Sequence, residues 1–590
     1  MTKDQGKHFL NDPTTLVSDS IRGLCYSQPH LRYLPQQNVV YDSKVRQIAK
    51  QQVTLVAGGG SGHEPAHAGF VGEGMLTAAV CGHVFASPSA SQVLDALELI
   101  KSPFGTLVII FNYTGDCLHF GLAVERAKAR GIHIAMLVVG DDISVGRSKG
   151  HKVGRRGMAA TALVIKVCGA LASKGASLEQ IVETGQYVID HSATLGVALN
   201  HCHVPGTASN VAFLESFEME LGTGIHNEPG LTKMSLMEAQ PLVERMVNML
   251  LDQEDQDRAY LTYNNKEMTP VVLLTNNYGG TPSLEFNVII KEAVEAISRR
   301  SSLCLKRILS GSFVTSLNMP GFSLSLLILD DDHLLELLDQ PVQAIGWSSS
   351  SISCFSPSLH DDPATSLSLL DTGSHDTRII DKSSDGTFII KVIQMVIQAL
   401  LKAEPTVTSY DTILGDGDCG YTLKSIAEAF EKELVNFPVS SIPDTLLALA
   451  DTIDQAAGGT SSAIYCIFLS ALANDLNKQM TQDQAPSLIM WAKACQQALD
   501  SLQVYTQARV GDRTMMDTLI PFVKTLNEPD TSLTKAIEAA RQGMWATQTQ
   551  TTQLGRTAYL SDQHVLDAGI PDAGAFGLMA VLDAIALALT

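Results

Sequence analysis

A long polar segment divides this chain into two unlike halves. Residues 346–385 are dominated by Ser, Thr, Asp and Pro, a composition that cannot bury enough apolar surface to fold alone. The full length of 590 residues also exceeds what one hydrophobic core usually supports. We therefore expect residues 1–345 and 386–590 to fold separately, joined by a linker of residues 346–385.

The first half has the pattern of an α/β protein. Short β-rich runs at residues 53–57, 106–113 and 133–140 alternate with Ala-rich amphipathic segments, which is the rhythm of βαβ units and of a mainly parallel sheet. Further β-rich runs follow near residues 271–280 and at 312–329. The pattern predicts a domain of two α/β lobes.

The second half has a helical pattern. The β signals nearly vanish after the linker, and long stretches rich in Ala, Leu and Ile repeat with helical spacing. An all-α domain is therefore expected. These stretches are residues 391–403, 444–457, 461–476, 486–502 and 573–589.

The net charge limits the possible partners. A charge of −21 repels nucleic acid and anionic lipid surfaces, and no block of Lys or Arg offsets it locally. We expect neither nucleic acid nor membrane as a partner. The same field repels ATP, so a nucleotide site in this chain needs metal ions and backbone N–H groups to supply positive charge.

The cysteines indicate a reducing compartment. Ten cysteines are scattered from Cys25 to Cys495 without a CxxC pair, which in a long chain is typical of reduced thiols. The first residues contain no apolar stretch of the signal-peptide kind. We expect a cytoplasmic protein.

A glycine-rich motif follows the first predicted strand. Residues 57–65 read AGGGSGHEP, and glycines at the end of a strand let a ligand approach bare backbone. Because His63 follows Gly62, the motif lacks the Gly-Lys-Ser/Thr of a P-loop. A plain tight turn is the alternative interpretation.

Two further segments carry candidate catalytic groups. Asp116 lies in NYTGD at the end of a predicted parallel strand, where ligands of α/β sheets collect, although a helix N-cap is an equal alternative. His226 lies in ELGTGIHNEPG, residues 220–230, where neutral imidazole is an accessible nucleophile. On spacing alone, a surface-loop histidine is the better interpretation of His226. The trio HCH at residues 201–203 is expected to be structural, because adjacent side chains on extended backbone diverge.

Carboxylates cluster in the helical half. Asp411, Asp416 and Asp418 fall within one short loop that contains glycines, and Mg²⁺ prefers carboxylate oxygens. Two such ions can bridge protein carboxylates to ATP phosphates. An EF-hand calcium loop is excluded, because counting from Asp416 places Ala427 at the twelfth position, where an acidic ligand is required.

Other loops of this half could contact a nucleotide. GGTSS at residues 458–462 precedes an apolar helix and can offer N–H groups and hydroxyls to phosphate, with a plain N-cap as an equal alternative. GDRTMMD at 511–517, Arg556 and PDAGA at 571–575 add loop residues able to close over a nucleotide. Each signal is weak alone.

Taken together and in order, these segments resemble a known family. They are GGGSGHEP, NYTGD, GDD-x₃-GR at residues 140–147, HCHVPG, ELGTGIHNEPG, NNYGG, GDGDCGYT, GGTS, GDRTMMD and PDAGAFG. Ten ordered segments across both halves resemble the single-chain ATP-dependent dihydroxyacetone kinases, the glycerone kinase and triokinase family of the fungal type. The resemblance implies a dihydroxyacetone-binding K domain of two α/β lobes, residues 1–345. It also implies an ATP-Mg-binding L domain, residues 386–590, that forms an eight-helix barrel.

The resemblance assigns roles in the K domain. It implies that His226 adds through Nε2 to the ketone carbonyl of dihydroxyacetone and forms a hemiaminal, which glycerol cannot form. Asp116 would take the proton of the attacking hydroxyl, and His63 would hydrogen-bond the substrate and balance charge. Catalysis is thus assigned to His226, Asp116 and His63. Substrate binding is assigned to Gly60, Ser61, Gly62, His63, Phe111 and Asp116.

The resemblance also assigns roles in the L domain. Asp411, Asp416 and Asp418 would hold two Mg²⁺ ions on the phosphates of ATP, so that transfer proceeds in line to the tethered hydroxyl. The implied ATP contacts are Cys419, Gly420, Tyr421, Thr422, Thr460, Ser461, Thr514, Met515, Arg556, Asp572, Ala573 and Gly574.

Three positions depart from the family pattern. Phe111 stands where a lysine is expected, Ser462 where a glycine is expected and Ala573 where a proline is expected. These changes motivate one alternative, a divergent non-catalytic paralogue that senses triose, against which the retained histidine and aspartates argue. A second alternative is an additional lyase activity that splits FAD to cyclic FMN at the metal and nucleotide site.

The resemblance further bears on substrates and assembly. Glyceraldehyde is a possible second substrate, because its aldehyde can also accept the imidazole. Members of the family dimerise through the K domain, so we expect a homodimer. Glycerol metabolism or detoxification of dihydroxyacetone is the expected setting.

Overall fold

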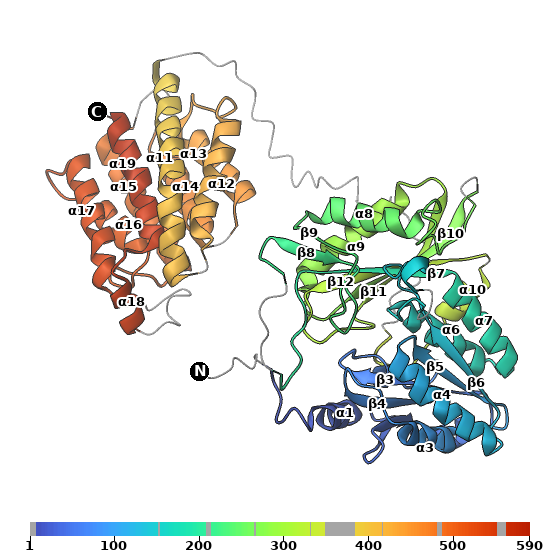
Figure 1. Cartoon of the computed structure of the whole chain (residues 1–590). Coiled ribbons are helices and arrows are strands. Elements are labelled where there is room, and N and C mark those ends of the chain that lie inside the picture. Colours follow the sequence, from blue (N-terminus) through green and yellow to red (C-terminus); the bar gives the residue numbers. More distant parts are fainter. Residues whose placement is uncertain are drawn as a thin grey trace. The chain divides into compact units, whose positions relative to one another are not determined.

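The computed structural model separates the chain into two compact units, Met1–Thr365 and Ser366–Thr590 (Figure 1). Residues 346 and 347 of the predicted linker are described with the first unit and residues 384 and 385 with the second; the rest of the linker lies outside the described residues. The structure describes residues 8–150, 154–207, 214–264, 267–330, 332–347, 384–415, 417–458, 460–480, 486–551 and 562–589.

The first lobe of the N-terminal unit is built on a six-stranded sheet of order β1-β2-β4-β3-β5-β6. Strands β4, β3, β5 and β6 run parallel, whereas β1 and β2 form an antiparallel edge. Strand β5 is buried along its whole length, as expected for a parallel strand with helices on both faces. The strands are β1 Leu31–Leu34, β2 Val39–Asp42, β3 Thr54–Ser61, β4 Ala78–Val84, β5 Thr106–Phe111 and β6 Ile134–Val139.

The second lobe has a different sheet, of order β11-β10-β12-β7-β8-β9. Among the described strands of this second sheet, only β10 and β11 pair in parallel, and the remaining neighbours pair antiparallel. The expected second α/β lobe is therefore present, with a mainly antiparallel sheet. The strands are β7 Ser192–Ala198, β8 Glu218–Leu221, β9 Thr232–Ser235, β10 Thr269–Asn277, β11 Leu303–Gly311 and β12 Gly321–Ile328.

Helices cover both sheets, and one helix lies between them. Helix α6 contacts strands of the first sheet and also β7 and β12 of the second, and every residue from Ala160 to Ala172 is buried. A helix that is apolar all round belongs inside such a layered core. The helices of this unit are α1 Leu16–Ser27, α2 Val45–Ile48, α3 Ala90–Ile100, α4 Thr114–Ala129, α5 Arg147–Gly150, α6 Ala160–Ser173, α7 Leu178–Asp190, α8 Ala239–Leu251, α9 Ser283–Ser298 and α10 His333–Leu338.

The C-terminal unit is helical throughout its described residues, as expected (Figure 1). Each long helix from α11 to α17 contacts the next one in the chain, α17 contacts α19, and α19 contacts α11. Eight helices of eleven residues or more, counted over the described part of the unit, thus close into a ring. They are α11 Ser384–Leu414, α12 Cys419–Glu433, α13 Ile442–Ala456, α14 Thr460–Gln479, α15 Leu488–Tyr505, α16 Met516–Leu526, α17 Leu533–Ala546 and α19 Ala573–Leu589, with the short α18 Asp562–Ala568.

Two segments of this ring are apolar enough to resemble membrane spans. Gly386–Leu414 and Asp562–Leu589 have the length and composition of spanning helices. Both contribute apolar side chains to the helical core, among them Ile393, Ile397 and Leu582. Of the most apolar stretch, 22% is buried in Gly386–Leu414 and 39% in Asp562–Leu589, so packing against neighbouring helices of the ring explains part of their apolar character.

Candidate active site

The glycine-rich motif belongs to a strand rather than to a loose turn. Strand β3 continues to Ser61, four residues beyond its expected end. A Cβ at Gly58 would overlap the carbonyl oxygen of Val80 and the ring of Phe120, so the absence of a side chain lets β4 and α4 pack closely against this strand. The prediction that the strand ends at residue 57 was therefore wrong.

His63 follows this strand and is held in one tautomer. Its Nδ1 lies 2.8 Å from the carbonyl oxygen of Thr315, and because a carbonyl only accepts, Nδ1 carries the proton. Burial, with the charge of His226, lowers the pKa of His63 to about 3. Considered without His226, the His63 ring is therefore neutral, with a lone pair on Nε2.

That lone pair faces His226, in the turn after β8. The Nε2 atoms of the two histidines are 3.0 Å apart, and the ring planes are nearly perpendicular with centroids 4.6 Å apart. The rings of Tyr113 and Phe85 also meet the His226 ring edge to face, at centroid distances of 4.6 and 5.0 Å. Aromatic walls therefore confine the imidazole on two sides.

Glu228 fixes the other side of His226. Its carboxylate accepts hydrogen bonds from the backbone N–H of His226, at 2.8 Å, and from Nδ1 of the ring, at 3.2 Å. Burial would raise the pKa of Glu228, but the hydrogen bonds and charge of His226, together with the charge of Arg156, lower it to about 2. Glu228 is thus an acceptor only, and Nδ1 of His226 is a donor.

The two histidines and Glu228 form a continuous proton chain. Both Nδ1 atoms carry protons that point to oxygen acceptors, and the contact between the Nε2 atoms requires one more proton between them. Three protons on four ring nitrogens give the pair of rings one positive charge. The carboxylate of Glu228 balances that charge.

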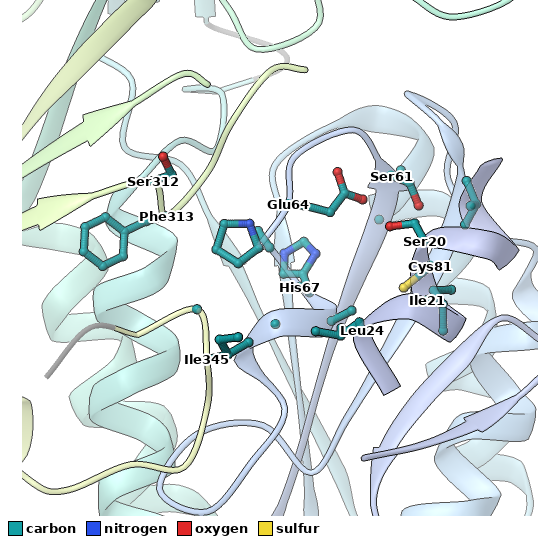
Figure 2. A pocket seen from close by; sticks show the side chains of 18 of the residues that line it. Ser20, Ile21, Leu24, Ser61, Glu64, His67, Cys81, Ser312, Phe313 and Ile345 are labelled. Carbon is teal, nitrogen blue, oxygen red and sulfur yellow. The ribbon is translucent and has the colours of Figure 1, made fainter. Parts of the chain in front are cut away.

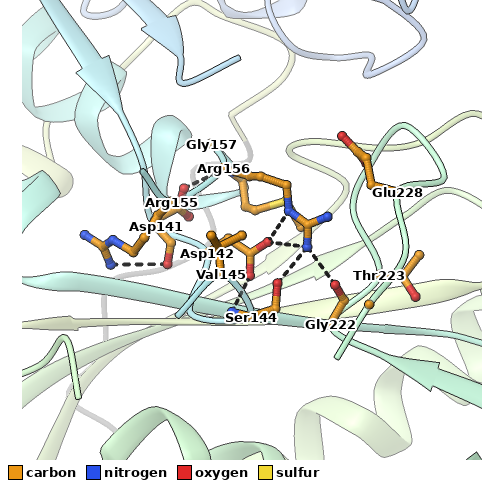
Figure 3. A network of polar contacts seen from close by, with 12 residues as sticks. Asp141, Asp142, Ser144, Val145, Arg155, Arg156, Gly157, Gly222, Thr223 and Glu228 are labelled. Carbon is orange, nitrogen blue, oxygen red and sulfur yellow. Dashed lines mark hydrogen bonds and ion pairs between the residues drawn. The ribbon is translucent and has the colours of Figure 1, made fainter. Parts of the chain in front are cut away.

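Arg156 braces the turn that carries His226. Its guanidinium donates to Asp142 Oδ2 at 2.8 Å, to Ser144 Oγ at 2.6 Å and to the carbonyl of Gly222 at 2.7 Å. Figure 3 shows these contacts converging on Arg156, with Glu228 in the neighbouring turn. The segment after β6 in the first lobe is thereby joined to the turn after β8 in the second.

A second clamp holds the residue next to the nucleophile candidate. Asn227 has a φ of 62°, a left-handed conformation that Asn tolerates better than most residues. Its side chain accepts from the N–H of Cys202, at 2.9 Å, and donates to the carbonyl of Cys202, at 3.0 Å. The HCH segment at 201–203 thus has a structural role here.

Asp116 lies in the first turn of α4 and is 4% exposed. Its Oδ1 accepts a hydrogen bond from Ser87 Oγ at 2.6 Å. Burial raises the pKa of Asp116 to about 6, although Ser87 and the charges of His226 and His119 oppose the rise. A Cβ at Gly59 would lie 3.3 Å from Oδ2. Asp116 is therefore a base of nearly neutral strength within the electrostatic range of His226.

Phe111 ends β5 beneath the histidines. It is 2% exposed, and its ring centroid lies 6.2 Å from that of His63, 4.7 Å from that of His67 and 6.3 Å from that of Tyr113. It offers no polar atom where the family pattern places a lysine. Its contacts indicate apolar support of His63.

The remaining residues predicted to bind substrate determine the backbone conformation and packing beside the site. Ser61 Oγ donates to the carbonyl of Gly82 at 2.8 Å, so this hydroxyl has a partner within the sheet. Gly62 has a φ of 106°, which requires glycine. A Cβ at Gly60 would come within 2.7 Å of the backbone nitrogen of Ala86.

A cavity of about 670 Å³ borders the same strand end. Figure 2 shows Glu64, His67 and Ser61 facing it, with α1 on one side and Phe313 on the other. Gly59 and Gly60 also line it, whereas His63, Asp116 and His226 are not among the described residues that do so. The cavity is therefore separate from the three predicted catalytic side chains.

In the helical unit, the predicted nucleotide residues gather at helix N-termini. Residues 419–422 form the first turn of α12, not a loop as expected, and Asp411 lies in the last turn of α11. Thr460 and Ser461 begin α14, Thr514 and Met515 precede α16, and Ala573 and Gly574 begin α19 after Asp572. Helix N-termini supply the N–H groups and positive dipoles that bind phosphate.

Several observations place these termini together. The N–H of Cys419 donates to Asp411 Oδ2 at 3.0 Å, and Asp411, Asp418 and Asp572 all raise the pKa of the Cys419 thiol, though burial is the largest cause. A Cβ at Gly574 would lie 3.5 Å from that of Met515. The ends of α11, α12, α16 and α19 therefore form one acidic site.

Buried aspartates order the loops of this site. Asp517 accepts from the N–H groups of Gly511, at 2.7 Å, and Thr514, at 2.9 Å. Asp572 accepts from the N–H of Ala575 at 2.8 Å, and burial raises its pKa to about 6. The carboxylate oxygens gathered here suit Mg²⁺.

Two predicted site residues, Asp416 and Arg556, lie outside the described residues. Within the described ranges, no group of three or more His, Cys, Asp and Glu side chains is arranged to hold a metal. Two of the three predicted metal ligands, Asp411 and Asp418, are described.

Sequence reasoning did not assign roles to several residues of the site. Glu228 could have been found from its position two residues after His226 in the same motif. Arg156, Thr315 and Ser87 come from distant segments, and no local pattern connects them to His226 or Asp116.

Comparisons with known proteins agree on one family. Residues 22–346 match the Dak1 domain and residues 413–587 match the DAK2 domain. The chain is 40% identical to dihydroxyacetone kinase 2 of Saccharomyces cerevisiae and 37% identical to dihydroxyacetone kinase of Pichia angusta, with 98% of each chain covered. It is 35% identical to triokinase/FMN cyclase of Homo sapiens, again over 98% of both chains.

A solved structure shows the same architecture. The dihydroxyacetone kinase of C. freundii in complex with AMP-PNP and Mg²⁺ matches with a TM-score of 0.62 and 30% sequence identity. The match covers 98% of this chain and 99% of that one.

Proposed function

The chain belongs to the dihydroxyacetone kinase family, and on that premise we propose that it phosphorylates dihydroxyacetone while the ketone is bonded to His226. ATP is the phosphoryl donor, and the product is dihydroxyacetone phosphate. The contact of 3.0 Å between the Nε2 atoms of His63 and His226 carries the proposal, because it places a proton-transfer partner beside the attacking nitrogen.

The addition step follows from the proton chain. Nε2 of His226 forms a bond with the ketone carbon, and the π electrons of the carbonyl move to its oxygen. That oxygen takes the proton held between the two rings, through Nε2 of His63. The products are a hydroxyl on the hemiaminal carbon, a neutral His63 and a positively charged His226 ring, so charge and protons balance.

Covalent attachment explains both selectivity and rate. A ketone or aldehyde can accept the imidazole, whereas glycerol has no carbonyl. The single directional bond fixes a small, flexible molecule with its terminal hydroxyl in place. Asp116 takes the proton from that hydroxyl as its oxygen attacks phosphorus.

The helical unit binds the nucleotide. Asp411 and Asp418, with Asp416, hold two Mg²⁺ ions, which neutralise charge on the phosphates during transfer. The helix N-termini at Cys419–Thr422, Thr460–Ser461, Thr514–Met515 and Asp572–Gly574 contact ATP, together with Arg556.

The departures from the family pattern leave this chemistry intact. Phe111 removes one polar contact to the ketose, so substrate affinity or preference is its expected effect. Ser462 and Ala573 alter the nucleotide loops without removing a carboxylate. Glyceraldehyde is included as a second substrate, and the enzyme acts as a cytoplasmic homodimer.

A second activity is favoured by one comparison. The human relative is named triokinase/FMN cyclase, so splitting of FAD to cyclic FMN at the helical unit is an additional candidate function. Formation of cyclic FMN from FAD in the presence of Mn²⁺ would reveal it. A non-catalytic triose sensor is disfavoured, because the residues of the proposed mechanism are all present.

The proposed function is tested by ADP release. Purified protein is incubated with ATP, Mg²⁺ and either dihydroxyacetone or glycerol, and ADP is measured in a coupled assay. We expect turnover with dihydroxyacetone, none with glycerol, and a loss of about 1,000-fold or more in the His226→Ala variant, because that variant lacks the nucleophile. No turnover by the intact protein would favour the sensor instead.

A further inference from the structure

One carboxylate at the site balances the charge of the two histidine rings but neither gains nor loses a proton in the reaction proposed above. Glu228 makes two hydrogen bonds to a single residue, His226, one to its backbone N–H and one to its ring. Its side chain is 30% exposed and that of His226 is 21% exposed. Both therefore lie at the mouth of the site, where the substrate must enter.

We propose that Glu228 is the positioning residue for the nucleophile: it fixes Nδ1 of His226 as the protonated nitrogen, aims Nε2 at the substrate and stabilises the positive charge that addition confines to the His226 ring. The inference rests on the proposed function, because it concerns the same covalent step. The positively charged His226 ring of the adduct needs a nearby negative charge, which Glu228 supplies.

The tautomer argument is geometric. A neutral imidazole has one N–H and one lone pair, and the hydrogen-bond partner of one nitrogen decides which is which. The contact of 3.2 Å with Glu228 places the N–H on Nδ1. Nε2 is then the nitrogen whose lone pair becomes available when the shared proton moves toward His63.

The charge argument follows from addition. Once Nε2 is bonded to carbon while Nδ1 keeps its proton, the ring is a cation that cannot lose its charge through Nε2. The titratable groups facing it are His63, Tyr113, Asp116 and Glu228. Of these described groups, Glu228 is the carboxylate in hydrogen-bond contact with the ring, so it stabilises the adduct most directly.

Arg156 acts on Glu228 through its charge and braces the turn in which Glu228 lies. The guanidinium bonds to Asp142, Ser144 and Gly222, and its charge reaches Glu228. A Cβ at Gly224 would overlap both Glu228 Oε2 and Arg156 Nη1. Gly224 therefore provides the space in which these two groups approach each other.

The test measures the adduct itself, without ATP. The full-length protein is mixed with [2-¹³C]dihydroxyacetone, and the tetrahedral carbon signal of the hemiaminal is integrated against free ketone and hydrate. We expect Glu228→Gln to lower the equilibrium constant of the adduct at least tenfold, because a nearby opposite charge is worth about one pKa unit or more. Glu228→Asp, which keeps the charge, should fall between Glu228→Gln and the wild type.

Glu220→Gln is the matched control. Glu220 lies in β8, just before the turn that carries His226, and is buried. It pairs with another histidine, His201, at 3.2 Å and accepts from the N–H of Gly230 at 3.0 Å. This variant loosens the turn without changing the charge beside His226. We expect a lower melting temperature for Glu220→Gln and an adduct within twofold of the wild type.

The outcomes separate the two proposals. A wild-type adduct that is lost in His226→Ala but kept within twofold in Glu228→Gln would overturn the role of Glu228 and leave the kinase mechanism standing. An equal loss in Glu220→Gln and Glu228→Gln would also overturn it, because the effect would then be structural. No adduct in the wild type would overturn the covalent mechanism and, with it, this inference.

Discussion

At the residue scale, the side chains of the site and their burial fix one another's protonation states. His63 is made neutral by burial and by the charge of His226, while its bond to Thr315 places the proton on Nδ1, and Glu228 is kept ionised by His226 and Arg156. Asp116 is weakened as an acid by burial. Groups with such displaced pKa values, gathered around one nucleophile candidate, are typical of catalytic sites.

The low-pH side of the kcat/KM profile should reflect the protonation of Asp116. Its pKa is raised to about 6, and a base must be deprotonated, so kcat/KM for dihydroxyacetone should rise as pH increases through about 6. The hydrogen bond from Ser87 favours the carboxylate. Ser87→Ala should therefore move the midpoint upward by about one pH unit, which a pH series of initial rates would show.

Ser89→Ala is the control for this shift. Ser89 lies two residues away and caps α3 through Gln92, without a contact to Asp116 among the described hydrogen bonds. Its removal should lower stability and leave the midpoint unchanged. If Ser87→Ala leaves the midpoint where it is, Asp116 is not the group that limits the rate at low pH.

Sequence patterns indicated His63, Asp116 and His226 as candidates, and the structure brings His63 and His226 into contact. Their catalytic roles remain predictions. Glu228 was not assigned although it lies two residues after His226 in the same motif, and Arg156 was not assigned because its importance depends on which atoms face one another across two lobes. No spacing along the chain encodes that information.

At the element scale, both candidate sites lie where regular elements end. Strands β3 and β5 lead directly to His63 and, through the start of α4, to Asp116. The nucleotide candidates lie at the N-termini of α12, α14, α16 and α19. Rigid elements therefore position the functional groups at both sites, while the short loops let a ligand come close to the backbone.

The loop before α16 offers a test of the nucleotide site. Asp517 is fully buried and holds the N–H groups of Gly511 and Thr514. In Asp517→Asn only one of the two side-chain atoms can accept, so we expect the KM for ATP to rise about tenfold, the cost of one hydrogen bond to a charged group. The dihydroxyacetone adduct should be unaffected.

Asp583→Asn provides the comparison in the same unit. Asp583 pairs with Arg541 between α19 and α17, and both side chains are partly exposed. Breaking such a pair should cost little stability and leave the KM for ATP unchanged. Equal ATP affinity in Asp517→Asn and the wild type would show that this loop does not order the nucleotide site.

The elements themselves were predicted unevenly. Continuous apolar runs identified β5 and β6, and Ala- and Leu-rich stretches identified α11, α13, α14, α15 and α19. Helices α12, α16 and α17 were missed. In α12 and α17 apolar residues alternate with many charged and polar ones, and Pro521 interrupts the pattern of α16; their helical form is stabilised by packing within the ring.

At the scale of the whole molecule, the chain combines two folds with complementary chemistry. In the proposed mechanism, the α/β unit supplies an imidazole and a base for a neutral ketose, and the helical unit supplies carboxylates and helix N-termini for a nucleotide with its metal ions. Because the net charge of −21 repels ATP, a nucleotide site in this chain needs metal ions and backbone N–H groups that supply positive charge locally. The polar composition of residues 346–385 predicts a linker, and most of these residues lie outside the described part of the chain.

The central claim is a covalent bond between the substrate and His226, and one measurement tests it directly. Full-length protein with ¹⁵N-labelled histidine is mixed with [2-¹³C]dihydroxyacetone, and the ¹³C–¹⁵N coupling of the bound carbon is recorded. We expect a tetrahedral carbon coupled to one imidazole nitrogen in the wild type and its absence in His226→Ala. Free ketone and hydrate signals alone, from a protein that still releases ADP with dihydroxyacetone, would contradict the account.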